Sequence, residues 1–384
     1  MQHFYFDHNA TTPLAPEVLE TVADCLGQTY GNASSIHRFG QRARQRFEAA
    51  RRQVAALIHA DPSNVIFTSG GTESNNLAIL GTVRAARPSG GHLIISSIEH
   101  PAVLEPAKQL EREGVEVTRV RPNPQGVVDP AEIRRAIRPD TALVSVMHAN
   151  NEVGTIQPVA EIARMTREAG IPLHVDGVQA LSKIAVDMDS LGVDLYSMSA
   201  HKLYAPKGVG ALYVRKGIRM APVVFGGRHE RDRRPGTENV PGAVGFGAAA
   251  ELAGRLLAED NARIGGLRDR LEQTILARIP GTGVNGSRES RVPNTTNIYF
   301  EGIDGEALVI ALDLRGFAVS TGSACSSGAI TPSHVLTAIG ASSDRARSSV
   351  RFSLGRGNDT EQVDRLVEAL EASVTHLRRI SVHA

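Results

Sequence analysis

Nucleophilic side chains are few in this chain of 384 residues. The only two cysteines, Cys25 and Cys325, exclude a disulfide framework and an all-cysteine metal site within one chain. Among 42 basic residues, only five are lysines, so any lysine chemistry must use one of these: Lys108, Lys183, Lys202, Lys207 and Lys216.

Cys325 stands in a stretch of small residues, Ser320–Gly328. Loops of this composition usually lie at the surface, so the thiol is a candidate nucleophile and a poor core residue. A free thiol has a pKa of about 8.5, and its thiolate can attack a sulfur atom. Cys25 shares the apolar face of a predicted helix with Val18 and Val22, and we interpret it as packing.

Other candidate groups follow short apolar runs that predict strands. The runs alternate with helical segments, a pattern typical of an α/β domain with a mostly parallel sheet. Ligands of such sheets bind outside the carboxyl ends of the strands. The six runs are Val65–Phe67, Leu93–Ile95, Ala142–Val146, Leu173–Val175, Asp194–Met198 and Ala211–Val214.

The first run is followed by Thr68–Asn76, which contains Gly70, Gly71 and Thr72 and leads into an apolar helix. Glycines before a helix leave the backbone amides accessible, and a helix N-terminus favours an anion. The stretch therefore fits a phosphate cup. A plain turn with a helix cap remains the alternative.

The next four runs are followed by His100, the pair Asn150-Asn151, Asp176 and Lys202, in that order. A lone histidine is usually structural, and tandem asparagines often form a turn. A carboxylate directly after an apolar strand, however, needs a cation or a donor, and a protonated pyridine nitrogen is one. Together with the cup, these groups are the parts that bind pyridoxal phosphate.

The remaining lysines have simpler interpretations. Lys108 lies on a polar helix face, Lys183 in a connection, and Lys207 and Lys216 in turns. We therefore expect Lys202 to carry the cofactor.

The stretch from Val292 onward predicts a smaller α+β domain. It contains strands at 297–300 and 349–353, a helix near 306–314, and a final helix that begins at Thr360. A helix from about Asn261 to Ile279 is expected to link the two domains. The arginine-rich stretch 38–52 has the spacing of an amphipathic helix with a solvated face, which we favour over a nucleic-acid site.

Bulk composition excludes few functions. The net charge of +1 implies no acidic partner, and the lack of tryptophan disfavours single-stranded nucleic-acid binding. Neither a signal peptide nor an apolar run of transmembrane length is visible. We expect a cytoplasmic protein with no membrane and no direct nucleic-acid partner.

Eight motifs in order give the chain a specific resemblance. It resembles the cysteine desulfurases of the class V aminotransferase family, in particular the long-loop subgroup of iron–sulfur assembly and nitrogen fixation, from Phe6 to about Ser381. The motifs are Phe67–Ser74, Glu99-His100, Asn150–Glu152, Val175–Gln179, Ser199–Lys202, Gly236–Asn239, Gly322–Cys325 and Arg351–Leu354.

The resemblance implies the fold of the pyridoxal-phosphate-dependent transferases of the aspartate aminotransferase type. Residues 15–260 would form the large cofactor-binding α/β domain with a mostly parallel sheet. Residues 1–14 and 261–384 would form the smaller α+β domain that carries the catalytic cysteine loop. The implied reaction converts L-cysteine to L-alanine and leaves a persulfide on Cys325.

The resemblance also implies roles for individual residues. Lys202 would bind pyridoxal 5'-phosphate covalently, His100 would stack on its ring and move protons, and Cys325 would take the sulfur. Arg351, with Asn151, would bind the substrate carboxylate. The remaining cofactor contacts would be Gly71, Thr72, Ser199 and His201 at the phosphate, Asp176 at the ring nitrogen, Asn151 and Gln179 near the ring hydroxyl, and Thr237 at the partner subunit's phosphate.

The role of Thr237 implies a homodimer with shared sites, and the persulfide implies a sulfur acceptor such as an iron–sulfur scaffold protein. Cys325 is then a candidate transient iron–sulfur ligand. His8, Gly177 and Ala200 depart from the commoner pattern of asparagine, alanine and glycine. The chain ends soon after Ser381, where housekeeping relatives carry a tail that contacts the scaffold, so the acceptor stays open.

Three alternatives remain at this point. Another enzyme of the same cofactor class, an aminotransferase or a selenocysteine lyase, is the nearest, although an aminotransferase needs no loop cysteine. A non-catalytic protein of the same fold is disfavoured by the intact Lys202 and Cys325. The biological role is open between cluster assembly, nitrogen fixation and tRNA thiolation.

Overall fold

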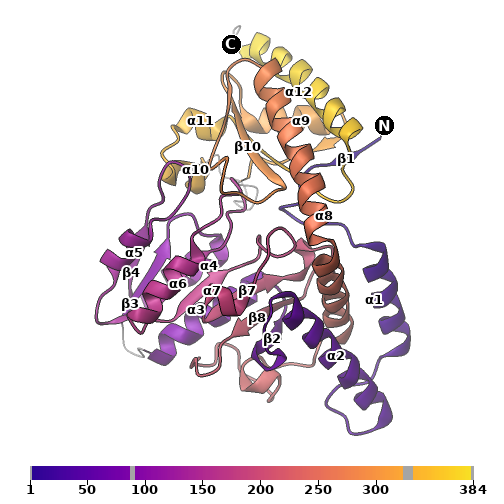
Figure 1. Cartoon of the computed structure of the whole chain (residues 1–384), viewed down its shortest axis with the longest axis vertical. Coiled ribbons are helices and arrows are strands. Elements are labelled where there is room, and N and C mark those ends of the chain that lie inside the picture. Colours follow the sequence, from indigo (N-terminus) through magenta and orange to yellow (C-terminus); the bar gives the residue numbers. More distant parts are fainter. Residues whose placement is uncertain (1, 87–90, 323–331, 382–384) are drawn as a thin grey trace.

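The computed structural model describes residues 2–86, 91–322 and 332–381 (Figure 1). Its largest sheet has seven strands in the order β2-β8-β7-β6-β5-β3-β4, and only β8 runs antiparallel to its neighbours. The predicted mostly parallel sheet is therefore confirmed. The strands are β2 (Val65–Thr68), β3 (His92–Ser96), β4 (Glu116–Val120), β5 (Thr141–Met147), β6 (Leu173–Asp176), β7 (Leu195–Ser199) and β8 (Gly210–Val214).

All six predicted strands are present, with ends within one residue of those predicted. Sequence reasoning missed β4, the edge strand that pairs only with β3 in this sheet. Three of its five residues are polar, and only Val120 is buried. An edge strand needs no continuous apolar run, so its pattern is weaker than that of the buried central strands.

Helices follow most strands and cover the sheet. Several begin with a proline in the first turn, which suits the fixed φ of that residue. They are α3 (Gly71–Ala86), α4 (Pro101–Arg112), α5 (Pro130–Ala136), α6 (Val159–Glu168) and α7 (Met188–Leu191), with 3₁₀ turns at η1 (Pro62–Asn64), η2 (Ala200–Lys202) and η3 (Glu230–Asp232).

Three further helices, α1 (Pro16–Gln28), α2 (Arg38–Leu57) and α8 (Val240–Arg278), pack together beside the sheet. As predicted, α2 is amphipathic, with Ala43 and Phe47 buried among its core residues. Arg51 is the exception to its solvated face. It is 3% exposed and pairs with Glu230 at 2.7 Å, in η3.

The helix predicted to link the domains begins at Val240, so the expected start near Asn261 was wrong. Residues 240–260 are rich in glycine and alanine, which gives no strong apolar stripe and a low helix propensity at each glycine. Small residues instead allow α8 to lie close to α2. A Cβ added to Gly247 would lie 2.8 Å from the Cα of Ala50.

The C-terminal part, in the upper half of Figure 1, contains the predicted strands and helices. β12 (Ser349–Ser353), β10 (Thr295–Phe300) and β9 (Thr282–Val284) form an antiparallel sheet, and β1 (Phe4–Tyr5) pairs in parallel with β11 (Phe317–Ala318). The helices are α9 (Gly305–Asp313), α10 (His334–Ala338), α11 (Ser343–Arg347) and α12 (Thr360–Ser381).

The described buried side chains form three clusters. Two lie against the seven-stranded sheet, and the third joins Phe6 to Phe300 and Phe352 and to the second half of α8. Domain limits at residues 14 and 260 remain a prediction. Within the part of the chain that the structure describes, no helix has both the length and the apolar character to cross a bilayer.

Candidate active site

A cavity of about 290 Å³ lies where the central strands end at their carboxyl side. Ten of the twelve residues predicted for the site line it, a grouping of distant positions that strand-end reasoning anticipates. They are Gly71, Thr72, His100, Asn151, Asp176, Gln179, Ser199, His201, Lys202 and Arg351.

Two predicted residues are not brought to the cavity by the described chain. Cys325 lies outside the described residues, although Gly322, three positions earlier, is in the cavity wall. Thr237 is exposed and does not line the cavity of its own chain. Its predicted role concerns the partner subunit.

The predicted phosphate cup is the first turn of α3. Gly71 and Thr72 line the cavity there, with Ser199 and His201 from the end of β7. A Cβ on Gly71 would lie 2.6 Å from Cγ2 of Val178, so glycine is needed for this close approach. Helix N–H groups and hydroxyls suit a phosphate dianion. Burial lowers the pKa of His201 to about 4, so its imidazole is neutral there.

Asp176 is 5% exposed at the end of β6. Its Oδ2 accepts a hydrogen bond of 2.7 Å from Asn75, and its Oδ1 accepts one of 3.0 Å from the Val178 backbone. Both donors are neutral, which leaves a buried carboxylate suited to a ligand cation such as a pyridinium N–H. Sequence reasoning missed Asn75, which lies one helical turn beyond Gly71 on α3.

Lys202 ends η2, directly after β7. Its Nζ donates to the backbone oxygens of Asn9 at 2.6 Å and Ala10 at 2.7 Å. The amine therefore sits between the amino-terminal segment and the strand ends. Of the five lysines, Lys202 alone lines the cavity among the described residues, as expected for the lysine that carries a cofactor.

His100 caps α4, and its Nδ1 accepts a hydrogen bond of 3.1 Å from the Ala102 backbone. Burial lowers the pKa of His100, so the ring is neutral near pH 7 and its proton is on Nε2. A neutral ring suits stacking on an aromatic ligand. Its Nε2–H is the group that can donate a proton.

The amino-terminal segment supplies site residues that sequence reasoning missed. Asn9 is 2% exposed, and its backbone oxygen accepts from both Lys202 and Gln179. Its side chain donates to the Asn151 backbone at 3.1 Å and to Thr295 Oγ1 at 2.8 Å. The motif that contains it was visible in the sequence, but nothing local indicated a role.

Lys183 was interpreted as a residue of a connection. It does lie in one, but it is 6% exposed behind the cavity and donates to Asn9 Oδ1 at 2.8 Å and to Gln179 Oε1. Burial, with the nearby charges of Lys202 and Arg351, lowers the pKa of Lys183 well below its usual range.

Arg351 lies on β12 and is 3% exposed. Its guanidinium pairs with Asp7 at 2.6 Å and donates to the Asn151 backbone oxygen at 2.9 Å. These two contacts hold the planar donor group against the cavity wall, where a substrate carboxylate can meet it.

Two departures from the family pattern have packing partners. A Cβ at Gly177 would lie 1.9 Å from the ring of Tyr196, whose hydroxyl bonds His148 Nδ1 at 2.9 Å. Glycine therefore makes room for this tyrosine. His8 packs in the same way against Gly355, where a Cβ would lie 2.3 Å from the imidazole.

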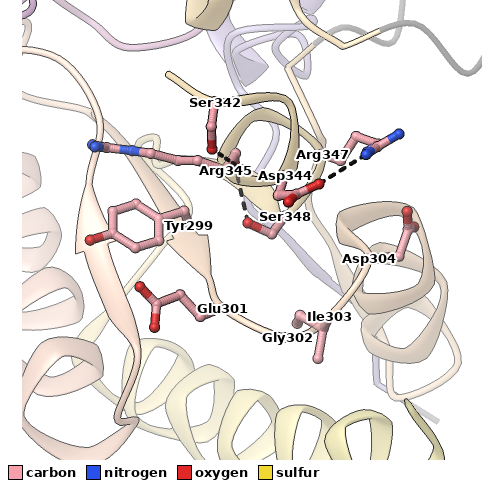
Figure 2. A pocket seen from close by; sticks show the side chains of 10 residues that line it. All are labelled: Tyr299, Glu301, Gly302, Ile303, Asp304, Ser342, Asp344, Arg345, Arg347 and Ser348. Carbon is pink, nitrogen blue, oxygen red and sulfur yellow. Dashed lines mark hydrogen bonds and ion pairs between the residues drawn. The ribbon is translucent and has the colours of Figure 1, made fainter. Parts of the chain in front are cut away.

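A second hollow, of about 610 Å³, lies in the C-terminal part between β10, α9 and α11 (Figure 2). None of the predicted site residues lines it. Its two arginines are already engaged, since Arg347 pairs with Asp344 at 2.9 Å and Arg345 lies over the Tyr299 ring and donates to Asn285. We interpret it as a surface groove without catalytic groups.

The residues around the first cavity fit pyridoxal phosphate. A cup for an anion, a buried acid with only neutral donors, and a lysine amine meet in one cavity, and the buried Oδ1 of Asn75 has no partner within the described ranges. The same ranges contain no cluster of three or more His, Cys, Asp or Glu able to hold a metal ion. The metal role proposed for Cys325 lies outside them.

Comparison with known proteins supports this picture. Residues 4–366 match the family described as aminotransferase class-V. The chain is 46% identical over 377 residues to the cysteine desulfurase IscS of Dictyoglomus turgidum, with 98% of this chain and 96% of the relative covered.

Solved structures are also similar. A NifS-like protein has a TM-score of 0.92 at 38% identity, covering 98% of this chain and all of that one. A structure described as SspA in complex with cysteine has a TM-score of 0.81 at 36% identity, covering 91% and 98%. The predicted transferase fold is thereby confirmed.

Proposed function

Since the chain belongs to the class-V aminotransferase family, among its cysteine desulfurases, we propose that it uses pyridoxal phosphate to convert L-cysteine to L-alanine and a persulfide on Cys325. One observation carries the proposal. The anion cup, Asp176, Lys202 and Arg351 surround a single cavity whose wall includes Gly322, close in sequence to Cys325.

Four residues that line the cavity have distinct roles in this proposal. Lys202 holds the cofactor, Asp176 stabilises its ring nitrogen as a cation, and Arg351 orients the substrate carboxylate. His100 stacks on the ring and donates from Nε2. The bound cofactor supplies an electron sink for the bonds of the substrate α-carbon.

The sulfur step balances without an added oxidant. The Cys325 thiolate attacks Sγ of the substrate, and an S–S bond forms as the substrate Cβ–Sγ bond breaks. The electron pair of the broken bond stays with the carbon fragment, which takes a proton and leaves as alanine. The two sulfur atoms remain on the enzyme as a persulfide.

The proposal is tested by supplying the purified protein with pyridoxal phosphate and L-cysteine. We expect a yellow protein that forms one alanine for each sulfur released when a thiol reductant is present. Transfer of the amino group to a 2-oxo acid, with no alanine from cysteine, would identify an aminotransferase instead. Much faster turnover of L-selenocysteine than of L-cysteine would identify a lyase for that substrate.

We further propose a homodimer in which Thr237 contacts the partner subunit's phosphate. The segment that leads to Thr237 is held against the phosphate cup of its own chain by two contacts. Glu230 accepts a hydrogen bond from the Phe67 backbone at 2.7 Å, and Arg234 pairs with Glu73 at 3.0 Å. Large apolar side chains are exposed on nearby elements, as expected of an interface. They include Leu26, Tyr30, Ile36, Phe39 and Phe225.

A mixed dimer tests the shared site. Thr237→Ala should weaken pyridoxal phosphate binding about tenfold or more, because a hydrogen bond to a charged group is lost. A heterodimer of Lys202→Ala and Thr237→Ala chains contains one intact site, so at a limiting pyridoxal phosphate concentration it should be more active than either homodimer. Full activity in a protein shown by light scattering to be monomeric at assay concentration would contradict the dimer.

We infer that the persulfide passes to an acceptor protein, such as an iron–sulfur scaffold, and that this occurs in the cytoplasm. The family membership and the thiol chemistry of Cys325 support an acceptor of this class.

A further inference from the structure

Lys183 is a buried side chain to which the proposed chemistry gives no role. It lies in the connection after β6, and among the described residues its Nζ donates to Asn9 Oδ1 and Gln179 Oε1. Both are amide oxygens, and neither partner carries a charge. Burying a lysine without a carboxylate partner is costly, so the arrangement calls for a function.

The chemistry of lysine decides how the Gln179 amide is turned. A lysine amine has donor hydrogens, whereas the two ends of a glutamine amide differ, one being an acceptor and the other a donor. Lys183 Nζ donates to this amide, so the end that faces Lys183 is Oε1. Nε2 is then placed on the other side, where one of its hydrogens goes to the Asn9 backbone oxygen at 2.9 Å.

Gln179 lines the cavity, so the second hydrogen of its Nε2 is available to donate to a ligand bound there. If the amide were reversed, an oxygen would face the cavity and would repel an ionised ring oxygen. Asn9 is fixed in the same way, because its Oδ1 accepts from Lys183 and from Asn294 at 3.0 Å. Lys183 thus fixes the oxygen ends of two amides beside the cavity, and the backbone oxygens of Asn9 and Asn151 hold their nitrogen ends.

We propose that Lys183 is a positioning residue that turns the Gln179 amide so that Nε2 donates to the ring oxygen of the bound cofactor. The proposal rests on the proposed function, because it takes pyridoxal phosphate as the ligand. Lys183 touches neither the cavity nor the substrate, and it acts through Gln179 and Asn9.

Lys183→Met, which has a similar shape and no donor, tests the proposal. Cofactor-free protein is titrated with pyridoxal phosphate, and the pH midpoint of the absorbance band is then measured. We expect the affinity for pyridoxal phosphate to fall about tenfold, which corresponds to the loss of one hydrogen bond. We also expect the pH midpoint of the absorbance band to move upward. A hydrogen bond from Gln179 Nε2 stabilises the ionised form of the cofactor ring oxygen and so keeps the pH midpoint low. When that hydrogen bond is lost, the protonated form of the cofactor persists to higher pH.

Several controls separate positioning from folding. The other ionisable groups around the cavity, His100, Asp176, His201, Lys202 and Arg351, are unchanged in the variant. Lys216→Met, an exposed lysine in a turn, should match wild type in affinity and midpoint. In a Gln179→Ala background, Lys183→Met should add little further shift, because its effect passes mainly through that amide.

A second variant covers failure of Lys183→Met to fold. Gln179→Glu keeps an oxygen toward Lys183 and gives it a charged partner, but it replaces the donor at the cavity by an acceptor. The pH midpoint of Gln179→Glu should therefore rise at least as far as that of Lys183→Met. A wild-type midpoint in Gln179→Glu, or in folded Lys183→Met, would overturn the inference. A wild type that forms no absorbance band with pyridoxal phosphate would overturn the proposed function as well.

Discussion

Replacing Lys202 by alanine should abolish covalent attachment of pyridoxal phosphate and reduce alanine formation to background. The expectation rests on position, because the Lys202 amine lies at the end of β7 among the residues of the cavity. Borohydride reduction followed by peptide mass spectrometry should fix the cofactor to Lys202 in wild type and to no lysine in the variant. The carbonyl oxygens of Asn9 and Ala10 lose a donor, so we also expect a lower melting temperature.

Lys108→Ala provides the matched control. Lys108 is exposed on α4, pairs with Glu105 and does not line the cavity. This variant should keep both the cofactor and the activity. Cofactor still fixed by borohydride in the Lys202→Ala protein would mean that another lysine carries it, and the assignment of the cavity would be wrong.

Replacing Cys325 by serine should stop sulfur transfer and leave cofactor binding intact. None of the proposed cofactor contacts is made by Cys325, so the yellow protein should form and still change its spectrum with L-cysteine. Alanine and persulfide formation should fall to background, because a hydroxyl near neutral pH is a far weaker nucleophile than a thiol.

Mass spectrometry after brief exposure to L-cysteine, without reductant, is the deciding measurement. One added sulfur on the peptide that contains Cys325 is expected. Cys25 supplies the control, since it is fully buried on α1 and burial raises the pKa of its thiol. Cys25→Ser should keep the chemistry and lose about 1–3 kcal/mol of stability at most, from a hydroxyl placed in an apolar environment.

An added sulfur found only on Cys25 would contradict the assignment. Wild-type alanine formation by Cys325→Ser would do the same. Either result would require another acceptor for the substrate sulfur.

The strand ends of the large sheet were predictable because their local patterns are strong. Asp176 and Lys202 each follow a buried apolar strand, and parallel strands present such residues at one edge. The resemblance then gave Arg351, which local patterns alone would not relate to the cavity. These residues carry most of the proposed chemistry.

Contacts between distant segments could not be predicted. Lys183 meets Asn9 across 174 positions, and no local pattern distinguishes it from a lysine in a surface turn. The same holds for Arg51, which its arginine-rich stretch led us to expect in solvent although Glu230 and two phenylalanine rings enclose it. The start of α8 was missed because packing overrides the low helix propensity of its glycines.

The place of Asn9 also has a consequence for how the protein is made. Its backbone N–H donates to Ser353 at 2.9 Å, 344 positions later, and its backbone oxygen accepts from Lys202. Ribosomes add about 5–20 residues each second, so roughly 17–70 s separate the synthesis of these two contacting residues. In the later part of that interval a nascent chain presents Asp176 and Lys202 without Arg351, which completes the cavity lining. We therefore expect pyridoxal phosphate to be acquired by the released, finished chain and not during translation.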